Sequence, residues 1–412
     1  MSKTTRWIAA LVVAPLATAA IAGCAATGDD GGDGEKVTIT FQEQFNDAES
    51  AQFEKQLKDF EKEHPEITVK LIRDNDSSYY DKLTTQITGG KGPDVVRVEP
   101  PRASQFIAAG WALPLGDAAG SASDYFASSL ESVTQDGELY GVPVDVSALA
   151  LFYRTDLFEA AGIDGPPATW DEFTADAEKL TSGDVHGVGL FGGWGGFEFY
   201  PWLWQSGAEV MNADQTEAVF NTPDAVRALQ LWVDLQKSAM PAGMATATED
   251  DLKGPFVSGT LAMMTSGPWM IPSLADAGID GKWAVAPLPA DKEAATVLGG
   301  LDLLILKNTE HADAAKTFVS WLMQDSVQKE WASTLGYLPV KSALYDDPTF
   351  KDDPSISAFA EVLGQAKSRP TIAQAGDIDT ALGTAVQAAL SGTKSAQDAL
   401  DEAVEASNKA LK

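Results

Sequence analysis

The sequence predicts an α/β fold in which parallel strands are covered by helices. Two observations lead to this prediction. Residues 36–98 alternate as strand, helix, strand, helix and strand, which is the pattern of βαβ units in a parallel sheet. A second set of alternating elements begins near Asp145. Because the chain has 412 residues, it is long enough for about two or three domains.

Hydrophobic periodicity defines the first set. Apolar and polar residues alternate from Lys36 onward, as in a strand with one buried face. Phe53, Leu57 and Phe60 fall on one stripe of the helix that follows, and Pro65 ends that helix. The expected elements are strands over 36–45, 67–72 and 93–98, and helices over 47–64 and 79–88.

The second set contains a clear helix start. Thr169 and Glu172 have the spacing of a capping box, in which each side chain accepts a hydrogen bond from the backbone of the other residue. The expected elements are a strand and a short helix within 147–163, helices over 169–180, 222–237 and 312–324, buried strands over 283–289 and 299–307, and an alanine-rich helical C-terminus from Thr380.

The first residues have the pattern of an export signal. Two basic residues precede an uncharged run over 7–22 that is shorter than a typical membrane-spanning helix. The ending Ile21-Ala22-Gly23-Cys24 resembles a bacterial lipobox, in which the cysteine is acylated and becomes the new N-terminus. We expect a lipoprotein signal peptide over 1–23, lipidation of Cys24, and a flexible tether over 24–35. The alternative is a plain secretory signal with an incidental cysteine.

Charge narrows the class of ligand. The chain has 60 acidic and 29 basic residues, so its formal net charge is −31. Such a chain repels phosphate backbones and anionic lipid headgroups, which argues against nucleic-acid binding and favours a neutral or cationic ligand. The hydrophobic fraction of 44% is normal for a folded core.

Common catalytic and metal-binding motifs do not occur in the sequence. It has no GxSxG, GxxxxGK[ST], HExxH or CxxC pattern, and its three histidines lie far apart. We therefore expect no catalytic residue, no metal and no cofactor. An exported glycosidase remains an alternative, because sixty acidic residues could include an opposed pair of carboxylates.

Several ordered motifs resemble one protein family. They are FEKEHPEITVKL, GGKGPDVV, GELYGVPVDVSALALFYRTDLFEAAGI, PPATWDEF, FVSGTLAMMTSGPW, APLP, GGLDLLILK and LGYLPV. This set resembles the extracellular solute-binding proteins that deliver sugars to ABC importers, the maltose-binding-protein-like group. The resemblance covers nearly the whole chain from Lys36 onward.

The resemblance implies a two-lobed fold of the type II periplasmic-binding-protein class, with the ligand in a cleft between the lobes. One lobe would comprise 36–144 and 299–338, and the other 146–297 and 342–412. Three crossings would join them, near Val144–Val146, Thr296–Gly299 and Tyr337–Lys341. It implies a monomer that serves the permease subunits of an ABC transporter from the outer face of the cell membrane. The same fold could also take a non-sugar solute, such as a polyamine or an iron chelate.

Aromatic residues are the expected platforms for sugar faces. The stretch FGGWGGFEFYPWLWQ over 191–205 combines glycines and aromatics, and Trp194 between two glycine pairs is the first candidate. A core tryptophan under a loop is the alternative for Trp194, while Trp202 and Trp204 are expected in the core. The resemblance assigns a stacking role to Trp269, which ends a G-x-x-A-M-x-x-x-G-x-W pattern. A position in the core is the alternative for Trp269 as well.

Polar candidates follow the strands, because open α/β sheets bind ligands at the carboxyl ends of their strands. Glu43, Asp76, Glu99 and Asp145 meet this criterion. Carboxylates form directional, charge-assisted hydrogen bonds with sugar hydroxyls. Each could instead be a solvated loop acid.

The resemblance adds four further candidates. Gly299 and Gly300 match the glycine pair of the strand that re-enters the first lobe, and Tyr337 and Arg369 lie in segments that often line the cleft. No aromatic residue follows Arg369 closely, whereas maltose binders often have a tryptophan there. The sequence therefore does not identify the sugar.

Overall fold

The computed structural model describes residues 36–45, 47–74 and 79–412. The expected signal peptide, Cys24, the tether and Asp76 lie outside these described residues. Within them, no helix has both the length and the apolar character that crossing a membrane requires.

A mixed six-stranded sheet contains the first set of elements. Its strand order is β12-β11-β3-β1-β2, with β6 paired to β11. The first three strands along the chain are parallel, as predicted, but β11 runs antiparallel to both β3 and β6. The strands are β1 (Val37–Glu43), β2 (Ile67–Arg73), β3 (Val95–Val98), β6 (Gly141–Ala148), β11 (Thr296–Ile305) and β12 (Ala366–Lys367).

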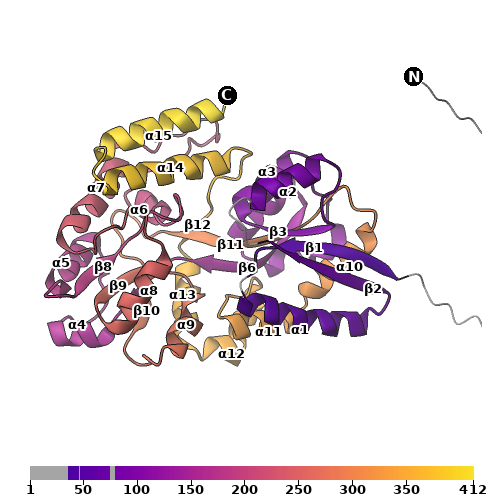
Figure 1. The fold of residues 1–412 in the computed structure, drawn as a ribbon, viewed down its shortest axis with the longest axis horizontal. Helices are drawn as coiled ribbons and strands as arrows, with labels where there is room; N and C mark the ends of the chain where they lie inside the picture. Colours follow the sequence, from indigo (N-terminus) through magenta and orange to yellow (C-terminus); the bar gives the residue numbers. More distant parts are fainter. Residues whose placement is uncertain (1–35, 46, 75–78) are drawn as a thin grey trace, which may run out of the picture. The chain divides into compact units, whose positions relative to one another are not determined.

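Helices from two separate parts of the chain pack against this sheet (Figure 1). The predicted stripe of α1 is confirmed: Phe53 and Phe60 lie in an aromatic cluster with Phe41 of β1 and Phe318 of α10. This cluster buries the apolar faces of helices that are far apart in sequence. The helices are α1 (Asp47–Glu63), α2 (Tyr79–Thr88), α3 (Pro100–Ala108), α10 (Ala312–Leu322) and α11 (Asp325–Leu335).

A second sheet contains four strands in the order β10-β7-β9-β8. Strand β9 pairs antiparallel with β7 and parallel with β8. All residues of β9 are buried, including the polar Thr265 and Ser266 at its end. The strands are β7 (Ala150–Tyr153), β8 (His186–Gly189), β9 (Leu261–Ser266) and β10 (Ala284–Ala286).

Helices cover the second sheet as well. The capping box that opens α5 is confirmed, since Thr169 and Glu172 exchange their hydrogen bonds. The predicted helical C-terminus is confirmed and consists of two helices, the first of which begins at Ala375, five residues before the expected start at Thr380. The helices are α4 (Thr155–Ala161), α5 (Trp170–Leu180), α6 (Tyr200–Gln205), α7 (Pro223–Ser238), α8 (Glu249–Ser258), α9 (Met270–Asp276), α14 (Ala375–Leu390) and α15 (Ala396–Ala410).

Short elements complete the described part of the chain. They are the hairpin β4 (Thr134–Gln135) and β5 (Glu138–Leu139), the helices α12 (Pro348–Lys351) and α13 (Pro354–Leu363), and the 3-10 helices η1 (Gly116–Ala119), η2 (Ala122–Asp124), η3 (Ala127–Val133) and η4 (Ser342–Asp346).

The β6–β11 pair lies between the two groups of elements (Figure 1). The two strands pair from Leu298 opposite Ala148 to Leu304 opposite Gly141, with an irregularity between Leu301 and Asp302. A single residue separates β6 from β7 of the second sheet, and β11 follows β10 of that sheet. The chain therefore passes between the sheets next to these two strands.

Candidate functional site

The main candidate site is a cavity with a volume of about 460 Å³. Strands β6 and β11 form its floor, and residues that follow β3, β8 and β9 contribute to its walls. Eight of the ten residues proposed from the sequence line it, namely Glu99, Asp145, Trp194, Trp269, Gly299, Gly300, Tyr337 and Arg369. The structure thus brings together residues that are up to 270 positions apart, from Glu99 to Arg369.

Two of the ten proposed residues do not line the cavity. Asp76 lies outside the described residues. Glu43 is fully buried, and its Oε2 accepts a hydrogen bond from the backbone N–H of Phe45. Burial raises the pKa of Glu43 to about 7, although this hydrogen bond and the nearby Arg97 oppose the shift. The side chain follows β1 as predicted, but it folds back onto its own chain.

Two tryptophans form the apolar wall of the cavity. The ring centroids of Trp194 and Trp269 are 6.1 Å apart, and their planes are inclined by 51°. The Trp269 ring lies directly over Gly267, where an added Cβ would come within 2.1 Å of a ring carbon. Both indoles remain partly exposed, whereas Trp202 and Trp204 are buried as predicted. This wall offers the partly exposed ring surface on which an apolar sugar face could stack.

Glycines let the Trp194 loop pack closely on its neighbours. The backbone N–H of Gly193 donates to the carbonyl of Ala247, and an added Cβ on Gly193 would lie 2.3 Å from that oxygen. Gly195 has a φ of 69°, and a Cβ added to Gly383 of α14 would lie 2.3 Å from the Cα of Gly195. The glycine pairs around Trp194 are therefore explained by backbone packing.

A buried network of charged and polar groups supports the cavity floor. Arg97 Nη2 donates to Asp145 Oδ2 at 2.7 Å and to Glu49 Oε1 at 3.2 Å. Tyr337 Oη donates to the same Glu49 oxygen at 3.0 Å. Burial raises the pKa of Asp145, and the ion pair with Arg97 opposes this shift. Arg97 therefore positions two cavity residues: it binds Asp145 directly and contacts Tyr337 through Glu49.

A second group of charges surrounds Arg369. Its Nη2 is 3.9 Å from Glu99 Oε2 and its Nη1 is 3.8 Å from Asp379 Oδ1. The guanidinium lies 5.1 Å from the ring centroid of Phe197. The side chain of Arg369 is 7% exposed, and its Nε has no hydrogen-bond partner among the described residues. Arg369 thus presents an unused donor within a largely buried setting.

The cavity also contains four residues that were not proposed from the sequence. They are Ser147, Phe197, Leu301 and Asp379. Phe197 lies in the aromatic stretch over 191–205, so the composition of that stretch could have indicated Phe197 as a site residue. Asp379 is the fifth residue of helix α14, and no local sequence pattern marks it as a site residue.

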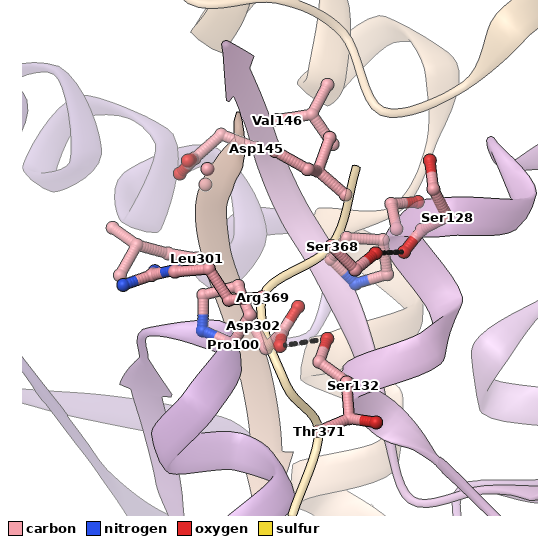
Figure 2. Close-up of a pocket in the computed structure, with 15 residues that line it drawn as sticks. Pro100, Ser128, Ser132, Asp145, Val146, Leu301, Asp302, Ser368, Arg369 and Thr371 are labelled. Carbon is pink, nitrogen blue, oxygen red and sulfur yellow. Dashed lines mark hydrogen bonds between the residues drawn. The ribbon is translucent and has the colours of Figure 1, made fainter. Parts of the chain in front are cut away.

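A much smaller cavity with a volume of about 20 Å³ adjoins the first. The two share five lining residues, Asp145, Gly299, Gly300, Leu301 and Arg369. Figure 2 shows Asp302 beside Ser132, whose Oγ donates to Asp302 Oδ2 at 2.7 Å. Burial raises the pKa of Asp302 to about 7, while the hydrogen bond from Ser132 lowers it. A neutral carboxylic acid is therefore favoured beside the main cavity below neutral pH.

Asp302 is expected to make the stability of the protein depend on pH. Its pKa is about 7 in the folded protein, against an ordinary value of 3.8. The folded protein therefore keeps the proton of Asp302 up to a higher pH than the unfolded chain does. The free energy of unfolding should therefore fall as the pH rises from about 4 to 7, by about 1.4 kcal/mol per pH unit from this group. Asp302→Asn should reduce that slope in urea unfolding measured at several pH values.

Asp347→Asn is the matched control for this measurement. Lys329 holds the pKa of Asp347 at about 2, so Asp347 is ionised in both states above pH 5 and its replacement should leave the slope between pH 5 and 7 unchanged. The prediction would be contradicted if the unfolding free energy of Asp302→Asn fell with pH as steeply as that of the wild type.

The described residues include no group of three or more His, Cys, Asp and Glu side chains placed to hold a metal ion. The site instead combines two indoles, a phenylalanine ring, paired charges and backbone glycines. Such a set is suited to noncovalent binding of a ligand that has both apolar faces and hydrogen-bonding groups.

Comparisons with known proteins agree with this architecture. The family model of bacterial extracellular solute-binding proteins matches residues 45–329. A putative binding protein of Brucella abortus (strain 2308) is 29% identical over 332 residues, which cover 78% of this chain and 80% of the relative.

Two solved structures have the same fold. An ABC transporter solute-binding protein from Thermotoga lettingae TMO, bound with α-D-tagatose, has a TM-score of 0.82 and 28% identity and covers 91% of this chain and 100% of its own. Maltose-bound MalE3 of T. maritima has a TM-score of 0.81 and 29% identity, with coverages of 91% and 98%. The two-lobed fold that the sequence resemblance implied is therefore confirmed.

Proposed function

Because the chain belongs to the family of bacterial extracellular solute-binding proteins, we propose that it captures a neutral disaccharide or oligosaccharide outside the cell and delivers it to the permease of an ABC importer. It is a binding protein rather than an enzyme, since its relatives are binding components of ABC transporters. The exported glycosidase is thereby set aside.

The observation that carries the sugar proposal is the pair of indoles at the edge of a cavity that also has polar lining residues. The ring centroids of Trp194 and Trp269 are 6.1 Å apart, so one sugar ring could contact both indoles. Hydrogen-bonding groups of Glu99, Asp145 and Arg369 lie around the same cavity. This combination matches the apolar faces and polar rims of a sugar.

The charged groups around the cavity argue against an anionic ligand. Asp145 is paired with Arg97, and Arg369 lies between Glu99 and Asp379. These three carboxylates outnumber the two guanidinium groups, so an anionic solute would meet an excess of negative charge. The relatives whose structures are bound to tagatose and to maltose support a sugar over a non-sugar solute.

We further propose that the two lobes are 36–144 with 299–338 and 146–297 with 342–412, joined by three crossings. The change of sheet between β6 and β7 supports this division. A sugar that contacts both lobes would favour a closed conformation, which the permease could recognise.

The test of the proposed function is a thermal-shift screen of the purified protein against mono-, di- and oligosaccharides, followed by titration calorimetry. A specific sugar at about a hundredfold over its dissociation constant should raise the free energy of unfolding by about 2.7 kcal/mol. Spermidine serves as the cationic comparison. Binding of spermidine without any sugar, or conversion of a sugar to product, would contradict the proposal.

We also propose that the protein is a monomer anchored by an acylated Cys24 to the outer face of the cell membrane. Cys24→Ser is expected to abolish labelling with radioactive palmitate in the native host and to release the protein into the medium. Membrane retention of an unlabelled Cys24→Ser protein would contradict the anchor. Light scattering of the soluble body tests the monomer.

A further inference from the structure

Glu249 holds the indole of the cavity tryptophan Trp269. It is the first residue of α8 and is 5% exposed. Trp269 Nε1 lies 2.8 Å from Glu249 Oε2 and 3.0 Å from Oε1, so one N–H is shared between both carboxylate oxygens. A carboxylate at the first position of a helix is also stabilised by the unpaired N–H groups of that helix.

The Trp269 ring is constrained on three sides. Glu249 contacts its edge, the backbone of Gly267 lies under one face, and Trp194 packs on it at an angle. Ser266, the last residue of β9, donates its Oγ hydrogen bond to Glu249 Oε1. Glu249 is therefore bonded to β9 and to the residue that lies three positions beyond that strand.

A second buried acid lies in the same region. Glu198 is fully buried, and neither of its carboxylate oxygens has a hydrogen-bond partner among the described residues. Burial raises the pKa of Glu198 well above its ordinary value, and repulsion from Glu249 adds to the shift. Glu198 therefore favours the neutral form, and the charge in this pair belongs to Glu249.

The surroundings of Glu249 bring the pKa of its carboxyl group close to neutral pH. Burial raises its pKa to about 7, while the hydrogen bonds from Ser266 and Trp269 lower it. The other charged groups that act on it are Asp250, which raises the pKa, and Lys253, which lowers it. The ionised form, which accepts most strongly from the indole N–H, thus predominates only above about pH 7.

We propose that Glu249 is a positioning residue for the ligand: its carboxylate fixes the orientation of the Trp269 indole toward the cavity and thereby sets the affinity for a ring-stacked ligand. The ligand part of this inference rests on the proposed function, whereas the positioning of the indole does not. Glu249 itself does not line the cavity, so it acts through Trp269.

The first experiment reads the indole directly in the unliganded protein. The Nε1–H resonance of Trp269 is identified in a ¹⁵N-tryptophan spectrum by its absence in Trp269→Phe. It is expected to titrate with an apparent midpoint near pH 7 in the wild type, because the midpoint reports ionisation of Glu249. Glu249→Met, which removes the acceptor at similar volume, should shift the resonance and abolish this titration.

Glu198→Gln is the matched control for Glu249→Gln, because it replaces another buried glutamate of the same region by glutamine. Since Glu198 favours its neutral form, this variant should retain the Trp269 resonance and its titration. Glu249→Gln keeps one acceptor oxygen but no charge, so it should keep the bonded position of the resonance and lose the titration.

The second experiment measures affinity for the sugar found in the screen. Glu249→Met should weaken binding by about 10-fold, the loss expected for a hydrogen bond to a charged group. Glu249→Gln and Glu198→Gln should each stay within about threefold of the wild type. The wild-type affinity should also fall between pH 8 and pH 5.5, and this fall should disappear in Glu249→Gln.

The outcomes separate the positioning role from the proposed function. An unchanged Trp269 resonance in Glu249→Met overturns the positioning role. A shifted resonance without any sugar binding in the wild type overturns the proposed function alone. A purely structural role would lower the melting temperature of Glu249→Met and leave its affinity at the wild-type value, which would also overturn the inference.

Discussion

Trp269→Ala is expected to weaken binding of the sugar by about 30-fold or more, as is typical of an aromatic anchor in a binding site. The ring supplies apolar contact area and a polarised face for stacking, and alanine supplies neither. The melting temperature of the unliganded protein should change by only a few degrees, because the ring is partly exposed at the cavity wall. Titration calorimetry and differential scanning calorimetry measure the two quantities.

Trp202→Ala provides the contrast to Trp269→Ala. Trp202 is fully buried against Trp170, Phe173 and Trp232. Its truncation should cost about 3–5 kcal/mol of unfolding free energy through the cavity that it leaves. If Trp269→Ala destabilised the fold as strongly and spared the affinity, Trp269 would be a core residue and its assignment to the ligand site would be wrong.

Arg97→Met is expected to lower the free energy of unfolding by about 3–5 kcal/mol. The substitution leaves the buried Asp145 without its guanidinium partner and removes one donor to Glu49. It also removes the contact of the guanidinium with the Phe45 ring, whose centroid is 4.7 Å away. Chemical denaturation at pH 8 measures the loss.

The same variant should recover part of its stability in acid. Without Arg97, the pKa of Asp145 is expected to rise further, because burial is then opposed by fewer interactions. The folded variant would retain a proton that the unfolded chain loses, so its deficit relative to the wild type should shrink as the pH falls from 8 to 5.

Arg227→Met is the control for this prediction. Arg227 pairs with Asp291 at 2.5 Å, but its side chain is 45% exposed. Loss of such a pair should cost no more than about 1 kcal/mol. Equal effects of the two substitutions would show that the buried network does not support the cavity floor as inferred.

Local sequence determined most of the secondary structure. The period of apolar residues located β1, α1, β2 and α2, and the bounds of α2 agree with the expected range at both ends. The start of α5 followed from its capping box. These features depend on residues within a few positions of each other, so the sequence pattern carries them directly.

The sequence also indicated which residues gather at the cavity. The carboxyl ends of parallel strands lie at the same edge of a sheet, so acids that follow such strands, for example Glu99, are expected near one another. The same rule does not determine where a side chain points. Glu43 follows β1 as expected, yet its carboxylate turns to the backbone of Phe45, because a local hydrogen-bond partner is available there.

Tertiary structure alone decided the remaining features. The antiparallel placement of β11 against β3 and β6, the pairing of Arg97 with Asp145, and the contact of Glu249 with Trp269 join residues that are 20 to 210 positions apart. A sequence pattern records the chemical character of each residue and its local period. It does not record which distant partner neutralises a buried charge, since that partner is selected by packing of the whole chain.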